Sequence, residues 1–425
     1  MLKGQFPVEK FASLRTPFYY YDLPLLRRTL DKIRECIEPY PQFHVHYAVK
    51  ANFNGRILQE ISRCGFGADC VSGGEVRAAL QNGFAPESIV YAGVGKSDEE
   101  ILLALDAGIA RFNVESAAEL EVINELALSR GVVAPVSLRV NPDIGAHTHA
   151  NITTGLAENK FGINYEQLPG VIELADSLPG VEYKGLHFHI GSQILEMDDF
   201  VALCNRINVL AEQILRQRRG RLVPAASSAA AVGYSSSAAG AAGAAGSGAV
   251  AGVAGAAASV LGDINVGGGL GINYYHPNHL DVAEFSQYFD TFARHLKLPA
   301  GTPVHFELGR SVVAPCGSLI SRVLYIKEGT TRRFAIIDAS MTELIRPALY
   351  KAYHRVENIS SYEPEEVYDV VGPVCESSDV FAKGVSIDKC HRGDFIAIRS
   401  AGAYGESMSS QYNCRPLPAC FFKED

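Results

Sequence analysis

Short apolar and β-branched runs recur along the chain as far as Gly309, and most are followed by a stretch with the periodicity of an amphipathic helix. Such runs predict buried strands, and the periodic stretches between them predict helices that cover those strands. The eight predicted strands are His44–Lys50, Gly65–Val71, Ser88–Gly93, Ala110–Glu115, Val136–Asn141, Tyr183–Ile190, Asp263–Gly268 and Val304–Gly309. The clearest predicted helices are Gly55–Cys64, Ser97–Asp106, Ser116–Arg130 and Asp199–Arg218.

Two of these helices begin with a serine that is followed three residues later by a glutamate. Ser97 precedes Glu100, and Ser116 precedes Glu119. In a capping box the serine hydroxyl accepts from the backbone N–H of the glutamate, and the glutamate carboxylate accepts from the backbone N–H of the serine. The spacing therefore predicts a capping box at both helix starts.

The alternation of strands and helices predicts a (β/α)₈ TIM-like barrel. A doubly wound sheet is the alternative, because the number of strands does not prove that the sheet closes. From Ser318 onward the predicted strands follow one another with few long helices between them, as in Leu319–Lys327, Arg333–Ile337, Glu366–Val371 and Asp394–Arg399. We therefore predict a barrel over residues 22–312 and a β-rich domain made of residues 1–21 and 313–425, which the early strand Phe18–Asp22 can join.

One segment interrupts this pattern. Residues 222–262 contain no charged residue, and 31 of the 35 residues from Ala225 to Ser259 are Ala, Gly or Ser. Such residues bury little apolar area, which argues against a membrane span. The segment follows a predicted helix and precedes a predicted strand, so we expect an inserted surface loop on the N-terminal face of the barrel.

Composition narrows the class of protein. The chain is 47% hydrophobic and carries a net charge of −9, which predicts a well-packed core and argues against nucleic acid as a partner. Nine cysteines without a CxxC pair argue against a disulfide framework and against a structural zinc site. The N-terminus lacks the apolar run of a signal peptide, so we expect a cytoplasmic protein that does not bind membranes.

Residues capable of chemistry lie at the ends of the predicted strands. In a barrel, the C-terminal strand ends form the active site. Ionisable residues at several such ends would be costly to bury together without a function. The residues in question are Lys50, Asp69, Arg139, His189, Gly267, Gly268, Gly269, Glu307 and Arg310.

These residue types together suggest pyridoxal 5′-phosphate (PLP). A desolvated Lys50 with a lowered pKa would form a Schiff base, although a lysine at a strand end can also simply point outward. The glycine run could cradle a phosphate or form a tight turn, and Arg310 could bind the phosphate. Glu307 could keep a pyridine nitrogen protonated.

The two histidines of HFHIGS allow several interpretations. His189 could lie flat against the cofactor ring, or it could be a core residue with its hydrogen bonds satisfied. His187 and His189 could also form a metal pair, but no third or fourth ligand occurs at a recognisable spacing, so we expect no metal.

The C-terminal region adds further candidates. Cys375 could donate a proton to a carbanion, or it could be an ordinary buried cysteine. Glu376 could bind an ammonium group, and Tyr404 could reach the cofactor or the substrate. Arg346 and Tyr350 would share one face of a helical turn, where the arginine could bind a substrate carboxylate or a structural glutamate.

In these residues and motifs the chain resembles the fold-type III PLP-dependent decarboxylases, from about Pro17 to Pro418, with a gap at 222–262. The motifs that carry the resemblance are YAVKAN, GADCVSGGE, RVNPD, HTHANITTGLAENKFGI, GLHFHIGSQI, INVGGGLGI, IRPALY, GPVCESSD and GAYGESMSSQYN. The resemblance implies an alanine racemase-like barrel with a β-rich domain, and a homodimer whose active sites are shared between subunits. One departure is Glu307-Leu308-Gly309-Arg310, where the family usually has Pro in the second position.

The resemblance also implies a role for each candidate. Lys50 would carry the cofactor, His189 would stack on its ring, and Cys375 would donate a proton across the dimer. The cofactor phosphate would be held by Ser192, Gly267, Gly268 and Gly269. Glu307 would pair with the pyridine nitrogen, and Arg310 would contact phosphate or substrate. The substrate would be bound by Arg310, Arg346, Tyr350, Glu376 and Tyr404. Tyr404 would also contact the cofactor.

Among these decarboxylases, the chain resembles the branch that acts on meso-diaminopimelate to form L-lysine. Its substrate has a second carboxylate and a second ammonium group, which Arg310, Arg346 and Glu376 would recognise. The alternatives are decarboxylation of ornithine, lysine or a carboxylated polyamine precursor such as carboxynorspermidine, and a PLP-binding homologue without activity. A racemase is disfavoured, because it benefits from an arginine rather than Glu307 at the pyridine nitrogen.

Overall fold

Eight parallel strands close into the predicted barrel. A computed structural model describes residues 6–142, 160–222, 260–276 and 282–424 of the chain. Pairing of β5 with β6 and of β10 with β2 completes the circuit, which excludes the open doubly wound sheet. A short strand, β7 (Ile163–Asn164), pairs with β6 outside the ring. In order around the barrel, the strands are β2 (Phe43–Ala48), β3 (Gly67–Cys70), β4 (Ile89–Tyr91), β5 (Arg111–Val114), β6 (Ala134–Asn141), β8 (Val181–His187), β9 (Asp263–Asn265) and β10 (Val304–Leu308).

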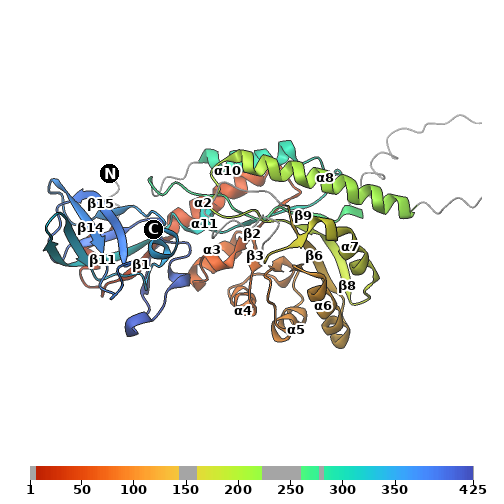
Figure 1. Cartoon of the computed structure of the whole chain (residues 1–425), viewed down its shortest axis with the longest axis horizontal. Coiled ribbons are helices and arrows are strands. Elements are labelled where there is room, and N and C mark those ends of the chain that lie inside the picture. The colour runs from red at the N-terminus through yellow and green to blue at the C-terminus, as the bar shows by residue number, and fades with distance from the viewer. Residues whose placement is uncertain (1–5, 143–159, 223–259, 277–281, 425) are drawn as a thin grey trace, which may run out of the picture.

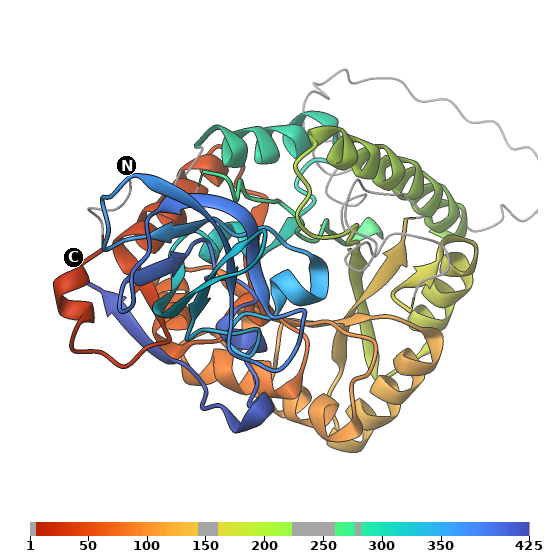
Figure 2. The ribbon, with the colours of Figure 1, turned by 60° about the vertical axis from the view of Figure 1, so that its left-hand side comes forward.

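Amphipathic helices surround these strands, as Figure 2 shows. In α3, for example, the buried residues Ile57, Leu58 and Ile61 form one stripe that faces the strands. Two long helices, α8 and α10, lie side by side along one edge of the barrel (Figure 1). The helices of the ring are α2 (Leu23–Ile37), α3 (Gly55–Arg63), α4 (Gly73–Gln81), α5 (Asp98–Ala107), α6 (Ala117–Arg130), α7 (Leu168–Ser177), α8 (Met197–Leu222) and α10 (Val282–His295).

The structure confirms one of the two predicted capping boxes. At α5 the Ser97 hydroxyl accepts from Glu100 N, and the Glu100 carboxylate accepts from Ser97 N. At α6 Ser116 caps Glu119 N, but the prediction of a full box is wrong. The Glu119 carboxylate instead accepts from Glu115 N and pairs with the buried Lys96 at 2.5 Å, because a buried ammonium group must find a counter-charge.

Three functional strands end earlier than the sequence predicts. Lys50 lies in a 3₁₀ turn, Val49–Ala51, after β2, and His189 lies in the loop after β8. The strand β9 stops at Asn265, because Gly267 has a φ of 72° that no strand residue adopts. These early ends place the functional side chains on turns above the barrel rather than on the strands.

Polar residues fill much of the barrel interior, where branched apolar residues are more usual. The ring nitrogens His46 Nε2 and His305 Nδ1 lie 3.0 Å apart, and His305 Nε2 lies 3.2 Å from Asp263 Oδ2. Arg111 donates to the same Asp263 oxygen at 2.7 Å. This chain of buried and partly buried groups runs through the barrel beneath Glu307, which is the neighbour of His46 in the β10–β2 register.

We expect His46 to make the stability of the protein depend on pH. Burial, and then the charge of His305, lower the pKa of His46 to about 3, so the folded state keeps it neutral. The unfolded chain binds a proton below about pH 6.5, so this contribution is present above that pH and is lost as the pH falls. Between pH 7.5 and 5.5 the parent should lose about 1.4 kcal/mol of unfolding free energy relative to His46→Gln. Urea unfolding of both proteins at the two pH values measures this; an equal change in both would contradict it.

A second domain contains an eight-stranded mixed sheet beside the barrel (Figure 1). The early strand β1 (Phe18–Asp22) lies in this sheet between β11 and β17, so both ends of the chain contribute to it. The other strands are β11 (Gly317–Glu328), β12 (Arg333–Ile337), β13 (Val356–Asn358), β14 (Glu365–Val371), β15 (Val380–Asp388), β16 (Phe395–Ile398) and β17 (Ala419–Lys423). The described residues also form three short α-helices: α1 (Val8–Phe11), α11 (Arg310–Val313) and α12 (Arg346–Tyr350).

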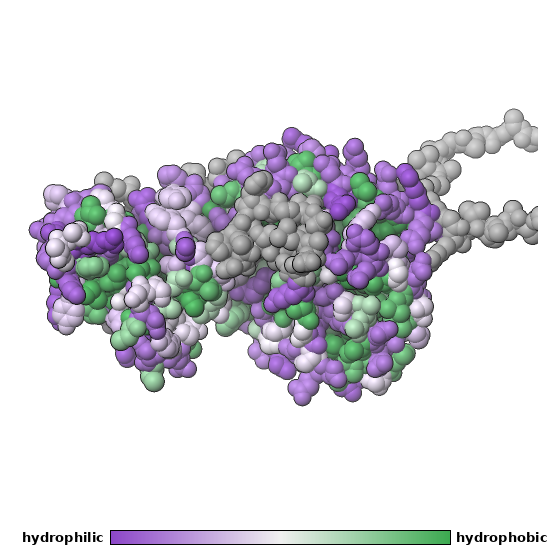
Figure 3. Space-filling model, viewed as in Figure 1, coloured by the Kyte–Doolittle hydropathy of each residue, from purple (hydrophilic) through white to green (hydrophobic). Residues whose placement is uncertain are grey.

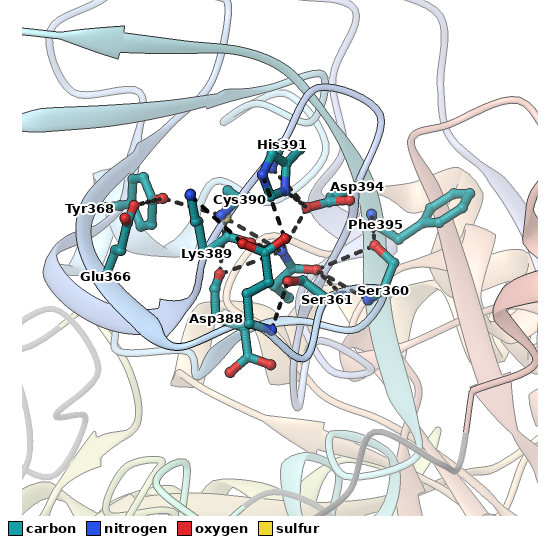
Figure 4. A network of polar contacts seen from close by, with 12 residues as sticks. Ser360, Ser361, Glu366, Tyr368, Asp388, Lys389, Cys390, His391, Asp394 and Phe395 are labelled. Atoms are coloured by element: carbon teal, nitrogen blue, oxygen red, sulfur yellow. Dashed lines mark hydrogen bonds and ion pairs between the residues drawn. The ribbon is translucent and has the colours of Figure 1, made fainter.

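A polar network ties the loops of this sheet together (Figure 4). At its centre, Asn358 donates to Asp394 Oδ2 at 3.0 Å and accepts from the backbone N–H groups of Ser360 and Ser361 at 3.1 Å. Phe395 N donates to Ser360 Oγ at 2.8 Å. These polar groups are satisfied by hydrogen bonds to one another. No group of acidic, histidine or cysteine side chains in the described residues has metal-binding geometry. The network therefore holds the sheet together.

The predicted insertion lies almost entirely outside the described residues. The helix α8 ends at Leu222 and β9 begins at Asp263, so the segment does connect a helix to the next strand, while residues 223–259 are not described. Within the described residues, no helix combines the length and the apolar composition needed to cross a bilayer.

Candidate active site

A cavity of about 850 Å³ opens at the C-terminal ends of the barrel strands and is closed on one side by the β-rich domain. Eight of the predicted site residues line it, and five of these come from the barrel while three come from the second domain. They are Lys50, His189, Ser192, Glu307, Arg310, Arg346, Tyr350 and Tyr404. The strand-end residues Asp69 and Arg139, to which the sequence assigned no role, line it as well.

Lys50 lies beside a buried carboxylate. Its Nζ is 3.6 Å from Asp69 Oδ2, and 37% of its side chain is open to the cavity. Within the described residues neither Asp69 oxygen has a hydrogen bond, and burial together with the charge of Glu307 raises the pKa of Asp69 to about 8. Burial alone would lower the pKa of Lys50, but Asp69, Tyr404 and Glu307 outweigh it, so that pKa is raised. The prediction that the pKa of Lys50 is lowered is therefore wrong for the folded chain by itself, because the sequence does not reveal the charges that surround Lys50.

Glu307 is held by three donors from three different strands. Asn265 and Asn113 donate to Oε1 at 2.7 and 3.2 Å, and His187 Nε2 lies 3.0 Å from Oε2. Although burial opposes it, the attraction of His187 and Lys50 holds the pKa of Glu307 well below its ordinary value. Glu307 is therefore an ionised carboxylate at the floor of the cavity, and His187 helps to position it.

The glycine run lies behind the cavity wall. Gly267 N donates to Asn265 Oδ1 at 2.9 Å, and Gly268 N donates to His189 Nδ1 at 3.3 Å. A Cβ at Gly268 would lie 1.8 Å from the carbonyl oxygen of Glu307, so close packing already requires glycine there. None of the three glycines lines the cavity, so their predicted contact with a phosphate remains a proposal.

His189 is neutral in this arrangement. Its Nδ1 accepts from Gly268 N, and burial followed by the charges of Lys50 and Arg139 keeps the pKa of His189 well below its ordinary value. An uncharged imidazole can lie against an aromatic ring without placing a further positive charge beside Lys50.

Two buried guanidinium groups face the cavity. Arg310 donates to Ser192 Oγ at 3.0 and 3.2 Å and to Tyr274 Oη at 2.8 Å, and it lies 4.8 Å from the centre of the Tyr404 ring. Arg346 donates through Nε to His354 Nε2 at 3.2 Å. In the part of the chain that the structure describes, neither arginine has a carboxylate partner at ion-pair distance. An uncompensated buried charge is costly, so both arginines are suited to bind anions that arrive with ligands.

The second domain is fastened to the segment that carries Lys50. Tyr404, which has a strained φ of 55°, donates through its backbone N–H to Ala51 O at 2.8 Å. Asn52 donates to Gly402 O at 2.9 Å. Tyr350 follows Arg346 by one turn of α12, as the spacing predicted, and both line the cavity.

Cys375 and Glu376 lie outside this cavity. Both are exposed, on the loop between β14 and β15, and Glu376 accepts from Tyr412 Oη at 2.6 Å. The loop is held in shape by the buried Asp379, which accepts from Val374 N at 2.9 Å and from Met341 N at 2.7 Å. One chain alone therefore does not bring these two residues to its own Lys50.

Four residues that orient the others were not predicted from the sequence. Asn113 and Asn265 hold Glu307, and Tyr274 and His354 hold the two arginines. The inward positions of Asn113 and Asn265 near their strand ends were a signal that could have found them. His354 lies eight positions after Arg346, but its second partner, the carbonyl of Arg399, is 45 positions away, so its local sequence did not indicate that it links the two.

Comparisons with known proteins agree with this geometry. A family model described as "Pyridoxal-dependent decarboxylase, pyridoxal binding domain" matches residues 26–218. Diaminopimelate decarboxylase of Bacteroides thetaiotaomicron is 54% identical over 424 residues, which cover 100% of both chains. The crystal structure of diaminopimelate decarboxylase from Helicobacter pylori complexed with L-lysine matches with a TM-score of 0.81 at 35% identity, over 98% of this chain and 94% of that one. The corresponding M. jannaschii co-complex with L-lysine gives 0.80 at 32% identity, over 98% and 89%.

Proposed function

Because this chain belongs to the diaminopimelate decarboxylases, a family of PLP-dependent enzymes, we propose that it converts meso-2,6-diaminopimelate to L-lysine and CO₂, the last step of lysine biosynthesis. In this reaction the bond between one α-carbon and its carboxylate breaks, and a proton takes the place of the carboxylate.

The observation that carries the proposal is the pair of unpaired arginines. Arg310 and Arg346 are both about 5% exposed and face a cavity that lies above Lys50 and Glu307. A cofactor phosphate supplies one anion, and the second carboxylate of diaminopimelate supplies another. A substrate without that carboxylate would leave Arg346 buried and unpaired, which typically costs a factor of about 10⁴ in specificity.

The residues around the cavity fit PLP. Among the described residues, buried polar atoms there lack hydrogen-bond partners, including both Asp69 oxygens and His187 Nδ1, as expected where a polar ligand binds. Lys50 would hold the cofactor covalently, and Ser192, Arg310 and the glycine run would hold its phosphate. Tyr404 would contact both the cofactor and the substrate.

When bound, PLP supplies a conjugated ring that withdraws electrons from the α-carbon. Glu307, which its three donors keep ionised, would hold a proton on the pyridine nitrogen and so increase this withdrawal. The neutral His189 would keep the ring in place and exclude water from one side of it. Arg346 and Tyr350 would bind the end of the substrate that does not react.

A second copy of the chain would complete the site. Cys375 and Glu376 are exposed here, and we propose that they enter the cavity of the other subunit in a two-fold dimer. Cys375 would then donate the proton to the α-carbon, and Glu376 would bind the distal ammonium group. Large hydrophobic side chains of the β-rich domain are exposed, among them Tyr362, Val367 and Leu417. Hydrophobic residues also lie on the surface of this domain in Figure 3, and both observations support an interface there.

The expected compartment is the cytoplasm. All nine cysteines, each within the described residues, are free thiols in the structure. Free thiols at exposed positions such as Cys375 and Cys414 suit a reducing environment.

A substrate panel tests the proposal. The purified chain with added PLP should turn over meso-diaminopimelate with a kcat/KM at least about 10³-fold above that for L-ornithine, L-lysine or carboxynorspermidine, since only the first carries a second α-carboxylate for Arg346. Faster turnover of one of the others would contradict the proposed substrate, and turnover of none would favour the homologue without activity.

A further inference from the structure

His354 uses both of its ring nitrogens in the folded protein. Nδ1 lies 2.9 Å from the carbonyl oxygen of Arg399, which can only accept, so Nδ1 carries the proton. Nε2 is then a free acceptor, and it accepts from Nε of Arg346 at 3.2 Å. The side chain is buried, and burial together with the charge of Arg346 lowers the pKa of His354 to about 3, so the acceptor is retained at neutral pH.

This bond occupies the one Nε of Arg346 and leaves its two terminal NH₂ groups. Within the described residues, those groups have no hydrogen-bond partner, and Arg346 lines the cavity while His354 does not. A guanidinium held by Nε presents its remaining edge in a fixed direction, as bidentate binding of a carboxylate requires.

Tyr274 connects this unit to the other arginine. Its hydroxyl accepts from Arg310 Nη1 at 2.8 Å, and its ring meets His354 edge to face with centroids 5.0 Å apart. The guanidinium of Arg346 lies 5.6 Å from the centre of the same ring. Tyr274 and His354 thus set the spacing between the two cationic groups that face the cavity.

We propose that His354 is a positioning residue for substrate specificity, which fixes Arg346 so that its terminal NH₂ groups bind the distal carboxylate of a dicarboxylic amino acid. The inference rests on the proposed function and deepens it, since it explains how a residue outside the cavity selects the substrate. The alternative is a purely structural role, in which His354 only links α12 to the backbone at Arg399.

The test compares His354→Phe, which keeps a ring but no acceptor, with His354→Gln, whose side-chain oxygen can still accept from Arg346. His354→Phe should raise KM for meso-diaminopimelate about 10- to 100-fold with kcat within about threefold, as expected for a lost hydrogen bond to a charged group. Binding of L-lysine, which keeps the distal carboxylate, should weaken by the same factor in calorimetry of the PLP-loaded enzyme. Binding of cadaverine, which has no carboxylate, should not change, and His354→Gln should restore most of the loss.

A buried histidine that contacts neither arginine provides the matched control. His46→Gln should leave the KM and the L-lysine affinity unchanged. If His354→Phe does not fold, His354→Asn, which is too short to reach Arg346, should give the same result. Unchanged KM and L-lysine affinity in a folded variant, or equal weakening for cadaverine, would overturn the role of His354 while the proposed function stands. A parent enzyme that prefers L-ornithine would overturn both.

Discussion

Replacing Lys50 with alanine is expected to lower turnover by on the order of 10⁴-fold or more, because the side chain that would hold the cofactor is removed. The absorption band of the lysine-bound cofactor near the edge of the visible spectrum should vanish at the same time. Lys50 lies at the floor of the cavity with Nζ 3.6 Å from Asp69, and Lys50→Ala leaves the backbone bond of Tyr404 to Ala51 available.

Turnover assays and absorption spectra of the same preparations measure this. Lys184→Ala serves as the control, since Lys184 pairs with Glu182 on the barrel surface and lies outside the cavity. Retained turnover in a folded Lys50→Ala protein would remove Lys50 from its proposed role.

Replacing Cys375 with alanine is expected to lower kcat about 10²- to 10⁴-fold, the usual contribution of a positioned proton donor. Because the exposed Cys375 does not reach the cavity of its own chain, the defect should be complemented in mixed dimers. Lys50→Ala and Cys375→Ala proteins, each nearly inactive alone, should recover up to about a quarter of the parental activity after subunit exchange, since half of the dimers are then mixed and each has one intact site.

The matched control is Cys414→Ala, which changes another exposed cysteine of the same domain and should leave activity unchanged. Mass spectrometry establishes that mixed dimers form. Mixed dimers without recovered activity would show that Cys375 does not serve the other subunit.

The sequence was sufficient to predict the barrel and the strand-end residues, because both depend on local patterns. Short apolar and β-branched runs mark each strand, and functional residues such as Lys50 and Glu307 lie at or close to the ends of these runs. The closure of the sheet, by contrast, depends on the pairing of β5 with β6, which no single segment encodes.

The electrostatics of the site could not be predicted in the same way. The pKa of Lys50 depends on Asp69 and Glu307, which are 19 and 257 positions away in the chain. Of the two partners of His354, Arg346 is eight positions away, but Arg399 is 45 positions away, and only folding brings it to the imidazole ring. The protonation states and the orientations of the site residues therefore depend on contacts between distant segments, which local sequence patterns do not predict.

We propose that this chain releases one carboxylate of meso-diaminopimelate and keeps the other. The most direct measurement is the stoichiometry of the products that the purified chain forms from meso-diaminopimelate in the presence of PLP. One L-lysine and one CO₂ for each substrate consumed is the predicted result. Consumption without CO₂, or CO₂ released together with cadaverine instead of L-lysine, would contradict it.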